Sequence, residues 1–287
     1  MIGSAELRGK PVPPGLHLVA TPIGNLSDIT IRALETLAGA DVLACEDTRT
    51  SRVLLDRYGI RRRTVAYHEH NAAEAGPRLL ETLEAGGSVA LISDAGTPLV
   101  SDPGFRLVEE AARRGHSVIP VPGPSAALAG LTASGLPTDA FLFAGFLPVK
   151  AGARERRLEA LRGVQATLVF FESPRRLGES LEAMAKVLGE ARPAAVAREL
   201  TKAFEEIRRG TLAELAGLYA DSPPKGEVVV CVGAGTEEAT GPEDVDRLLL
   251  ELSGSMPASK AAAEAARLTG RPKSELYQRL VELKGDG

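Results

Sequence analysis

The chain has 287 residues, of which 44% are apolar and 25% are charged, and its formal net charge at pH 7 is −4. These values are typical of a globular protein, and the length allows more than one domain. No apolar run reaches the roughly 18 residues that a membrane helix needs, and residues 1–15 lack the apolar stretch of a signal peptide. We therefore expect a cytoplasmic protein with no membrane partner. Because the net charge is negative, a nucleic-acid partner would have to bind a local basic surface.

The strand-like and helix-like patterns of the chain alternate strictly after a Pro-rich leader at residues 1–15. Short apolar runs predict strands at 16–21, 41–45, 64–67, 89–92 and 117–121. Helical patterns follow these runs and end near residues 37, 58, 84, 114 and 133. This alternation predicts an α/β domain whose parallel sheet has helices on both faces.

The second half of the chain predicts another α/β domain and a helical extension. Residues 135–150 are interpreted as the crossover between the domains. Strands are predicted at 167–171, 194–198, 205–208 and 227–232. Because only a short turn separates two of these strands, they should pair antiparallel within a mixed sheet. Residues 233–241 form a Gly-rich linker, and amphipathic helices are predicted at 259–268 and 273–283. We therefore expect domains at 1–136 and 137–236 and a helical extension at 242–287.

The cysteines and histidines do not predict a metal site. Cys45 and Cys231 each lie in an apolar run, which favours buried free thiols over a disulfide. His68 and His70 flank Glu69, but no third ligand is nearby, and a surface loop explains this spacing as well. We expect no bound metal.

The loops that leave the carboxyl ends of the first five strands are the candidate ligand site, since ligands bind at this edge of open α/β sheets. Their small residues suit a polar cofactor that is bound largely through the main chain. In the central loop, Gly96 permits close backbone approach and Asp94 carries the charge. The alternative is an ordinary connection in which Asp94 caps a helix. The lack of G-x-G-x-x-G after the first strand argues against a dinucleotide.

Several motifs resemble the tetrapyrrole methylase superfamily and, within it, the ribosomal RNA small subunit methyltransferase I branch. They are VATPIGNLSDIT (19–30), CEDTR (45–49), SDAGTPLVSDPG (93–104), VPGPSA (121–126), FFESPRR (170–176), RELTK (198–202) and KGEVV (225–229). The resemblance covers about residues 16–283 and implies two α/β domains with S-adenosylmethionine between them. It further implies a homodimer that methylates the ribose 2′-hydroxyl of a cytidine in the decoding region of 16S ribosomal RNA, within the small ribosomal subunit.

The same resemblance implies which residues contact the cofactor. Ser93-Asp94-Ala95 stand where the wider superfamily has Gly-Asp-Pro. The matching positions in the first domain are Pro22, Asp94, Gly96, Thr97, Ser125 and Ala126. The second domain adds Phe171, Thr201 and Gly226.

Methyl transfer to a ribose hydroxyl requires in-line positioning and is helped by a base or a cation near the oxygen. Our candidates are Glu46 and Asp47, either of which could accept the proton, with Arg49 to orient the carboxylate or hold a phosphate. A capping and salt-bridge cluster at a helix N-terminus is the alternative interpretation. Glu172 is a further candidate base, and Lys202 could favour the alkoxide.

Binding of ribosomal RNA requires cationic contacts. Basic clusters occur at 61–63, 154–157, 175–176 and 208–209, and at Lys260, Arg267, Arg271 and Lys273. We favour Arg175 and Arg176, which begin a helix at the interdomain cleft. The C-terminal helices have helix-turn-helix proportions and could bind RNA, a second subunit or the rest of the chain. A methyltransferase of tetrapyrrole precursors and a non-catalytic RNA-binding ribosome assembly factor remain alternative functions.

Overall fold

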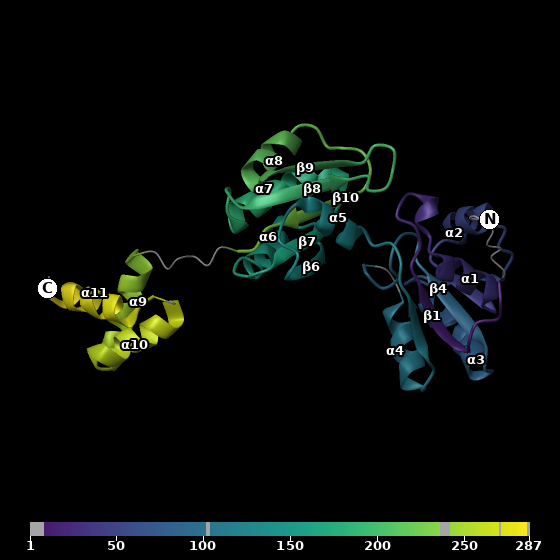
Figure 1. The fold of residues 1–287 in the computed structure, drawn as a ribbon, viewed down its shortest axis with the longest axis horizontal. Coiled ribbons are helices and arrows are strands. Elements are labelled where there is room, and N and C mark those ends of the chain that lie inside the picture. Colours follow the sequence, from purple (N-terminus) through teal and green to yellow (C-terminus); the bar gives the residue numbers. More distant parts are fainter. Residues whose placement is uncertain (1–8, 102–103, 236–241, 270, 286–287) are drawn as a thin grey trace.

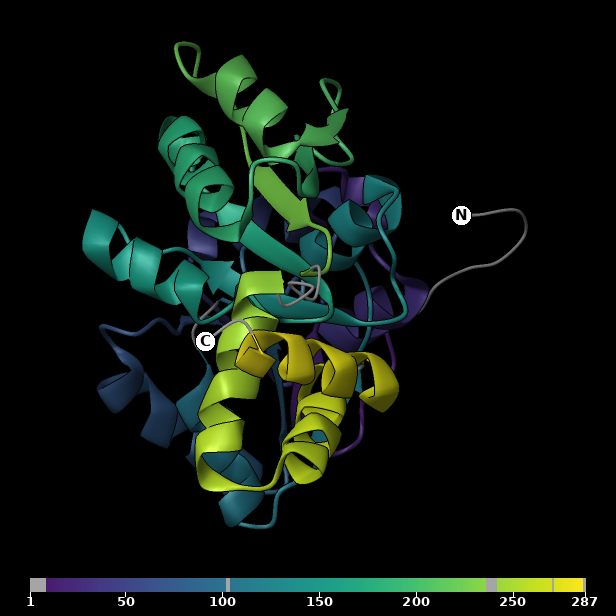
Figure 2. The same cartoon turned by 90° about the vertical axis from the view of Figure 1, so that its left-hand side faces the viewer.

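The computed structural model describes residues 9–101, 104–235, 242–269 and 271–285. Figures 1 and 2 show two α/β domains followed by a group of C-terminal helices. The start of the predicted leader, Asp102 and Pro103 of the central loop, and most of the predicted Gly-rich linker lie outside the described residues. No helix within the described ranges combines the length and apolar character of a membrane span.

The first sheet of the described chain is fully parallel, with the strand order β3-β2-β4-β1-β5. Its strands are β1 (Gly15–Val19), β2 (Val42–Cys45), β3 (Thr64–Ala66), β4 (Ser88–Ile92) and β5 (Val118–Val121). The prediction of a parallel first sheet is therefore confirmed.

Helices cover both faces of this sheet, as the sequence predicted. α1 (Ile31–Gly39) and α2 (Thr48–Arg57) lie on one face, and α3 (Ala72–Glu84) and α4 (Phe105–Arg113) lie on the other. Alternate residues of a strand point to opposite faces. In β4, Ala90 packs with the α1–α2 core and Val89 packs with the α3–α4 core. Because both faces are buried, the strand is apolar from Val89 to Ile92 rather than alternating.

The second sheet is mixed, with the strand order β6-β7-β10-β8-β9 in the described chain. Its elements are β6 (Phe141–Phe146), α6 (Ala151–Glu159), β7 (Thr167–Glu172), η2 (Pro174–Arg176), α7 (Leu177–Leu188), β8 (Pro193–Arg198), β9 (Glu206–Thr211), α8 (Leu212–Tyr219) and β10 (Val228–Val232). β8 and β9 pair antiparallel, as predicted, whereas β6 and β7 pair parallel.

The interpretation of residues 135–150 as only a crossover was wrong for Phe141–Phe146. This segment is the edge strand β6, and its register shifts between Phe143 and Gly145. Phe141 is 45% exposed and Phe146 is 54% exposed. The run is apolar like the central strands, but Gly145 interrupts it at the register shift and Pro137 and Pro148 flank it, as in a connecting segment.

The two domains share a core around α5 (Ala126–Ser134). This helix follows the first sheet, yet Leu131 packs with Val169 and Val229 of the second sheet. A Cβ atom on Gly130 would lie 2.7 Å from Val229 Cγ1, so glycine permits this close approach. The other face of the second sheet is covered by α6, α7 and α8. α5 therefore holds the β5 loop against the second domain.

The C-terminal region contains α9 (Pro242–Ser255), α10 (Ala258–Thr269) and α11 (Lys273–Gly285). Its helices bury a core of their own, which includes Leu249, Ala261, Ala265 and Leu280. The predicted helical extension is confirmed.

Candidate active site

Backbone hydrogen bonds join the loops after β1, β4 and β5 into one rim. Thr21 and Gly96 exchange N–H···O bonds of 2.9 and 3.0 Å, and the Thr21 hydroxyl donates to the Ser93 carbonyl at 3.2 Å. The Thr97 hydroxyl donates to the Pro124 carbonyl at 3.3 Å. Gly96 has φ +82°, a conformation that L side chains rarely adopt. The rim is therefore held by main-chain hydrogen bonds together with the Thr21 and Thr97 hydroxyls.

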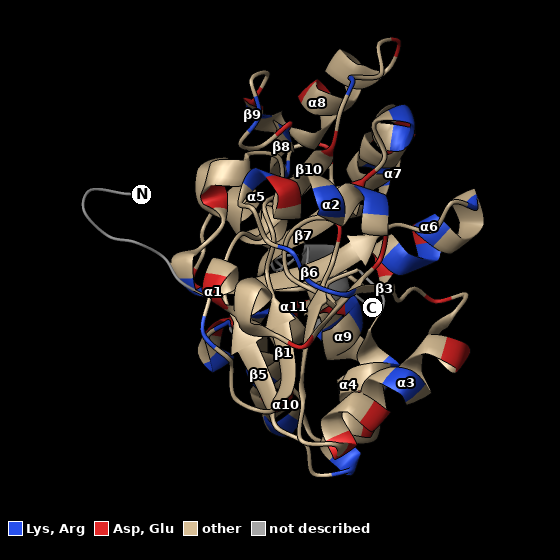
Figure 3. Ribbon diagram, turned by 90° about the vertical axis from the view of Figure 1, so that its right-hand side faces the viewer, with Lys and Arg blue, Asp and Glu red and all other residues tan. Residues whose placement is uncertain are grey.

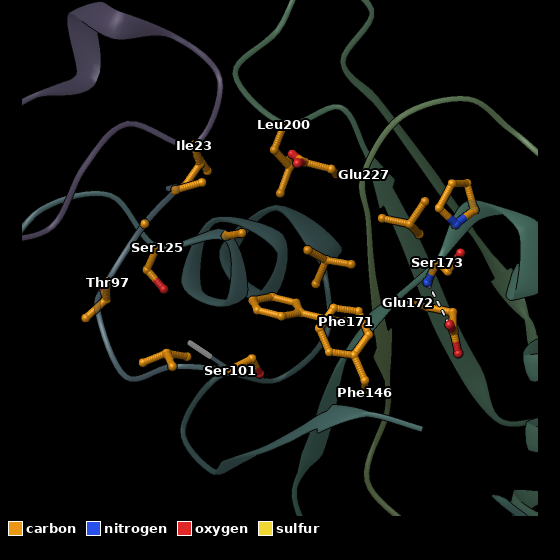
Figure 4. A pocket seen from close by; sticks show the side chains of 17 residues that line it. Ile23, Thr97, Ser101, Ser125, Phe146, Phe171, Glu172, Ser173, Leu200 and Glu227 are labelled. Carbon is orange, nitrogen blue, oxygen red and sulfur yellow. Dashed lines mark hydrogen bonds between the residues drawn. The ribbon is translucent and has the colours of Figure 1, made fainter. Parts of the chain in front are cut away.

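A cavity of about 380 Å³ lies between this rim and the second sheet. We call it the interdomain cavity. Its volume is in the range of small-molecule and cofactor sites. It is lined by five of the predicted cofactor contacts: Gly96, Thr97, Ser125, Ala126 and Phe171. Figure 4 shows Thr97 and Ser125 on one side of this cavity and aromatic rings on another.

The walls of the interdomain cavity differ in polarity. Phe171 packs edge to face on Phe146 at 5.7 Å and on Phe143 at 4.9 Å between ring centroids. Ser125 begins α5, and its hydroxyl accepts the Leu128 N–H at 3.5 Å. The N-terminus of α5 therefore presents main-chain N–H groups opposite an aromatic wall. A flat ring and a polar or anionic end suit these two walls.

The predicted candidate base Glu172 lies at the floor of the interdomain cavity, where its side chain is fully buried. Its carboxylate accepts hydrogen bonds from Arg176 at 2.5 Å, the Ser180 hydroxyl at 2.6 Å and the Ser173 N–H at 2.6 Å. Arg176 also donates to the Leu147 carbonyl at 3.2 Å. The structure thus pairs the candidate base with one of the favoured RNA-binding arginines. Arg175 is exposed.

A second cavity of about 310 Å³ adjoins the first and shares Ile23, Ala95 and Glu227 with it. We call it the outer cavity. The predicted cofactor contacts Pro22 and Asp94 line this cavity and are not among the residues that line the first. Helix α2 forms one side, and Lys202 of the second domain lies opposite. The sequence analysis did not single out Glu227, although it lies in the KGEVV motif. The position of Glu227 directly before the buried strand β10 was the feature of the sequence that could have identified it.

Lys202 stands where the two cavities meet, between Glu199 and Glu227. Its Nζ atom is 2.8 Å from Glu199 Oε1 and 3.0 Å from Glu227 Oε2. Burial acts to lower the pKa of Lys202, but hydrogen bonds to both carboxylates outweigh burial and raise it. The ammonium group is therefore protonated at neutral pH. A Cβ atom on Gly24 would lie 2.5 Å from Lys202 Cγ, so the lysine stem covers the β1 loop.

The predicted residues Thr201 and Gly226 shape the backbone around this lysine. Thr201 has φ +68°, and its buried Oγ1 atom has no hydrogen-bond partner among the described residues. Gly226 has φ +95°, and a Cβ atom there would overlap the Glu199 carboxyl group. Neither residue lines the two cavities. A side chain at position 226 would therefore displace Glu199, which is a partner of Lys202.

The predicted catalytic trio lies beside the cavities rather than in their linings. Asp47 caps α2 by accepting the Arg49 N–H at 2.8 Å, and its own N–H donates to Asp94 Oδ1 at 3.1 Å. Hydrogen bonds from the Arg49 N–H and guanidinium lower the pKa of Asp47. Burial and the neighbouring Asp94 raise the pKa of Glu46. The Arg49 side chain is 91% exposed.

Two family models match the chain. The model for Tetrapyrrole (Corrin/Porphyrin) Methylases matches residues 15–216, and that for the RsmI C-terminal HTH domain matches residues 239–284. The ribosomal RNA small subunit methyltransferase I of Mesorhizobium japonicum is 68% identical over 293 residues, covering 100% of both chains. The protein of the same name from Pseudomonas aeruginosa is 49% identical, covering 94% of this chain and 98% of that protein. The chain belongs to the ribosomal RNA small subunit methyltransferase I family.

Solved structures share the fold of this methyltransferase I chain at lower identity. Cobalt precorrin-4 methyltransferase superposes with a TM-score of 0.58 at 19% identity, covering 76% of this chain and 94% of that one. Uroporphyrin-III C-methyl transferase from Thermus thermophilus, complexed with S-adenosyl homocysteine, has a TM-score of 0.54 at 22% identity, covering 76% and 96%. Membership of the methyltransferase I family makes the chain an S-adenosylmethionine-dependent methyltransferase. The described residues contain no His, Cys, Asp and Glu group that could hold a metal.

Proposed function

We propose that the chain methylates the ribose 2′-hydroxyl of a cytidine in the decoding region of 16S ribosomal RNA, within the small ribosomal subunit. The observation that carries this proposal is a pair of cavities that meet at Ile23, Ala95 and Glu227. One cavity has the size and the walls for the methyl donor, and the other provides room for an acceptor beside it. The names of the relatives support ribosomal RNA as the substrate.

The residues of the interdomain cavity fit S-adenosylmethionine. The aromatic wall of Phe146 and Phe171 suits the purine, and main-chain groups at Gly96 and Ala126 suit the polar parts of the molecule. A Cβ atom on Gly96 would lie 3.3 Å from Ile23 Cγ2, so glycine keeps the rim open. When bound, the donor supplies an electrophilic methyl group. We assign Gly96, Ala126 and Phe171 to donor binding, together with Thr97 and Ser125.

The outer cavity would hold the acceptor ribose, with Lys202 and Glu227 at its hydroxyl. In the transfer, the ribose oxygen forms a bond to the methyl carbon while the carbon–sulfur bond breaks, and its electron pair remains on sulfur. The hydroxyl proton passes to the Glu227 carboxylate, which is 74% exposed. The Lys202 ammonium stabilises negative charge on the oxygen. We assign proton acceptance to Glu227 rather than to Glu46 or Asp47, because those two do not line either cavity.

The test is transfer of a radiolabelled methyl group to purified small ribosomal subunits that lack the modification, followed by mapping of the labelled nucleotide. We expect one labelled cytidine, modified on its ribose. Lys202→Met and Glu227→Gln should lower the rate at saturating substrate while donor affinity, measured by isothermal titration, stays within about threefold. Labelling of a base, or of porphyrinoid substrates in preference to subunits, would refute the proposal. Failure to bind the donor would favour the alternative that the protein is a non-catalytic, RNA-binding ribosome assembly factor.

We also propose a homodimer that acts in the cytoplasm, where small ribosomal subunits are assembled. Exposed apolar side chains on and after β6 support a subunit contact: Phe141, Leu142 and Val149 are 45%, 37% and 74% exposed. Light scattering of the purified protein tests this, and a monomer at micromolar concentration would contradict it.

A further inference from the structure

A groove lined by arginines lies along α2, on the side of the helix that faces away from the outer cavity. We call it the arginine groove. Its volume is about 710 Å³, and it contains five arginines but only two aspartates, Asp41 and Asp56. The arginines are Arg49, Arg52, Arg61, Arg62 and Arg63. On a chain whose net charge is −4, this groove is a local excess of positive charge.

The ion pairs that these arginines make within the protein are weak. Arg52 and Arg61 share one acceptor, Asp56, at 3.6 and 3.0 Å, and both arginine side chains are 75% exposed. Exposed pairs of this kind contribute at most about 1 kcal/mol. The Arg63 guanidinium is exposed and has no hydrogen-bond or ion-pair partner within the described residues. Asp41 is held by the Ser88 N–H and hydroxyl at 2.8 and 2.7 Å. The groove can therefore exchange weak internal pairs for an external anion.

Helix α2 separates this groove from the outer cavity. Thr50, Ser51 and Leu54 lie on one face of α2 and line the outer cavity. Arg49 and Arg52 lie three residues apart on another face and line the groove. A helix with its side chains is about 10–12 Å across. A polynucleotide strand in the groove would thus be within a few nucleotides of a ribose in the outer cavity.

The second domain carries a rival basic surface. Arg156 and Arg157 of α6 and Arg175 of η2 are exposed, and α2 and α6 both show blue ribbon in Figure 3. Arg175 follows Pro174, which lines the interdomain cavity, so this surface borders the proposed donor site. The arginine groove instead lies across helix α2 from the proposed acceptor site. Position relative to the acceptor favours the groove.

We propose that the arginine groove binds the phosphodiester backbone of the RNA segment that flanks the methylated nucleotide. The inference rests on the proposed function, since it assumes that the acceptor in the outer cavity is a ribose of RNA. Arg52, Arg61 and Arg63 contact successive phosphates, and Asp56 limits their strength. Contacts to phosphates position the strand without reading its sequence.

The experiment measures binding of the full-length protein to unmodified small ribosomal subunits as a function of salt. The test variant is Arg52→Gln/Arg61→Gln/Arg63→Gln. Each phosphate contact makes the fall of log K with log salt steeper by about 0.7. Loss of three contacts should therefore make the slope less steep by about 2. The KM for subunits should rise about tenfold or more, with kcat nearly unchanged. Donor affinity by isothermal titration should be that of the wild type, which also shows that the variant is folded.

Two further variants make the test specific. Asp56→Asn frees Arg52 and Arg61 and should strengthen binding to subunits, which a damaged fold would not do. Arg78→Gln/Arg113→Gln/Arg114→Gln removes the same charge from α3 and the end of α4, on the other face of the sheet. This matched control should leave the salt slope close to that of the wild type.

Three results would refute the proposal that the arginine groove binds RNA. They are wild-type affinity and slope in the test variant, equal losses in the matched control, and a loss found only in Arg156→Gln/Arg157→Gln/Arg175→Gln. In each case the wild type would still methylate subunits, so the proposed function would stand. A wild type that binds the donor but transfers no methyl group to subunits would instead refute the proposed function.

Discussion

The ion pair below the interdomain cavity offers a quantitative test of how the second domain is held together. The buried Glu172 carboxylate accepts hydrogen bonds from Arg176, Ser180 and the Ser173 N–H. Glu172→Ala leaves a cation and a hydroxyl without their acceptor. Breaking a buried pair costs about 3–5 kcal/mol. Because Arg176 is 20% exposed and keeps its bond to the Leu147 carbonyl, we expect a loss of about 3 kcal/mol.

Urea unfolding followed by circular dichroism measures this loss, and amide hydrogen exchange assigns it to β7 and α7. The comparison is the double substitution Glu172→Leu/Arg176→Met, which removes both charges together. Replacing both partners by apolar side chains costs less than stranding one of them. We therefore expect the double variant to be more stable than Glu172→Ala. A cost below about 1 kcal/mol for Glu172→Ala, or a double variant that is less stable than Glu172→Ala, would refute the reasoning.

Three further predictions concern the rim, the acid range and the thiols. Gly96→Ala should weaken donor binding in isothermal titration, because φ is +82° there and the residue lines the cavity; unchanged affinity would contradict its placement. Hydrogen bonds from Ser88 lower the pKa of Asp41 below its usual value of 3.8. The ionised Asp41 carboxylate therefore stabilises the folded state fully above about pH 3.8, and this contribution is lost as the pH falls through the folded-state pKa. Asp41→Asn should therefore lose less stability than the wild type between about pH 5 and about pH 2 in urea unfolding. Burial raises the pKa of Cys231 to about 12 and also raises the pKa of Cys45, so iodoacetamide at about pH 8 should modify both only after unfolding, as read by mass spectrometry.

Local patterns were enough to predict most of the fold. The β4 strand is apolar on both faces from Val89 to Ile92, which a sheet covered on both sides explains. The antiparallel pairing of β8 and β9 followed from the short connection between them. The edge strand β6 was missed although its sequence is apolar, because Gly145 interrupts the run and Pro137 and Pro148 flank it, as in a connecting segment.

The location of some residues of the candidate site was predicted from the sequence, and the location of others was not. The family resemblance implied that Gly96, Ser125 and Phe171 contact the cofactor, and all three line the interdomain cavity. The sequence did not indicate that Asp94, two residues from Gly96, would line the outer cavity instead. In a tight loop, adjacent residues point in different directions, and the Thr21–Gly96 bridge decides which direction each takes.

The sequence by itself determined the family and the order of most elements, and it predicted the loops of the candidate site, because these depend on short-range patterns and on motifs. Only the tertiary structure decided that Lys202 meets Glu227 where the cavities join, and that α2 separates an arginine groove from the outer cavity. Lys202 follows β8 and Glu227 precedes β10, so the antiparallel pairing of these two strands brings the side chains together. The packing of α5 on the second sheet then sets this pair against the first domain, and no local pattern encodes either contact.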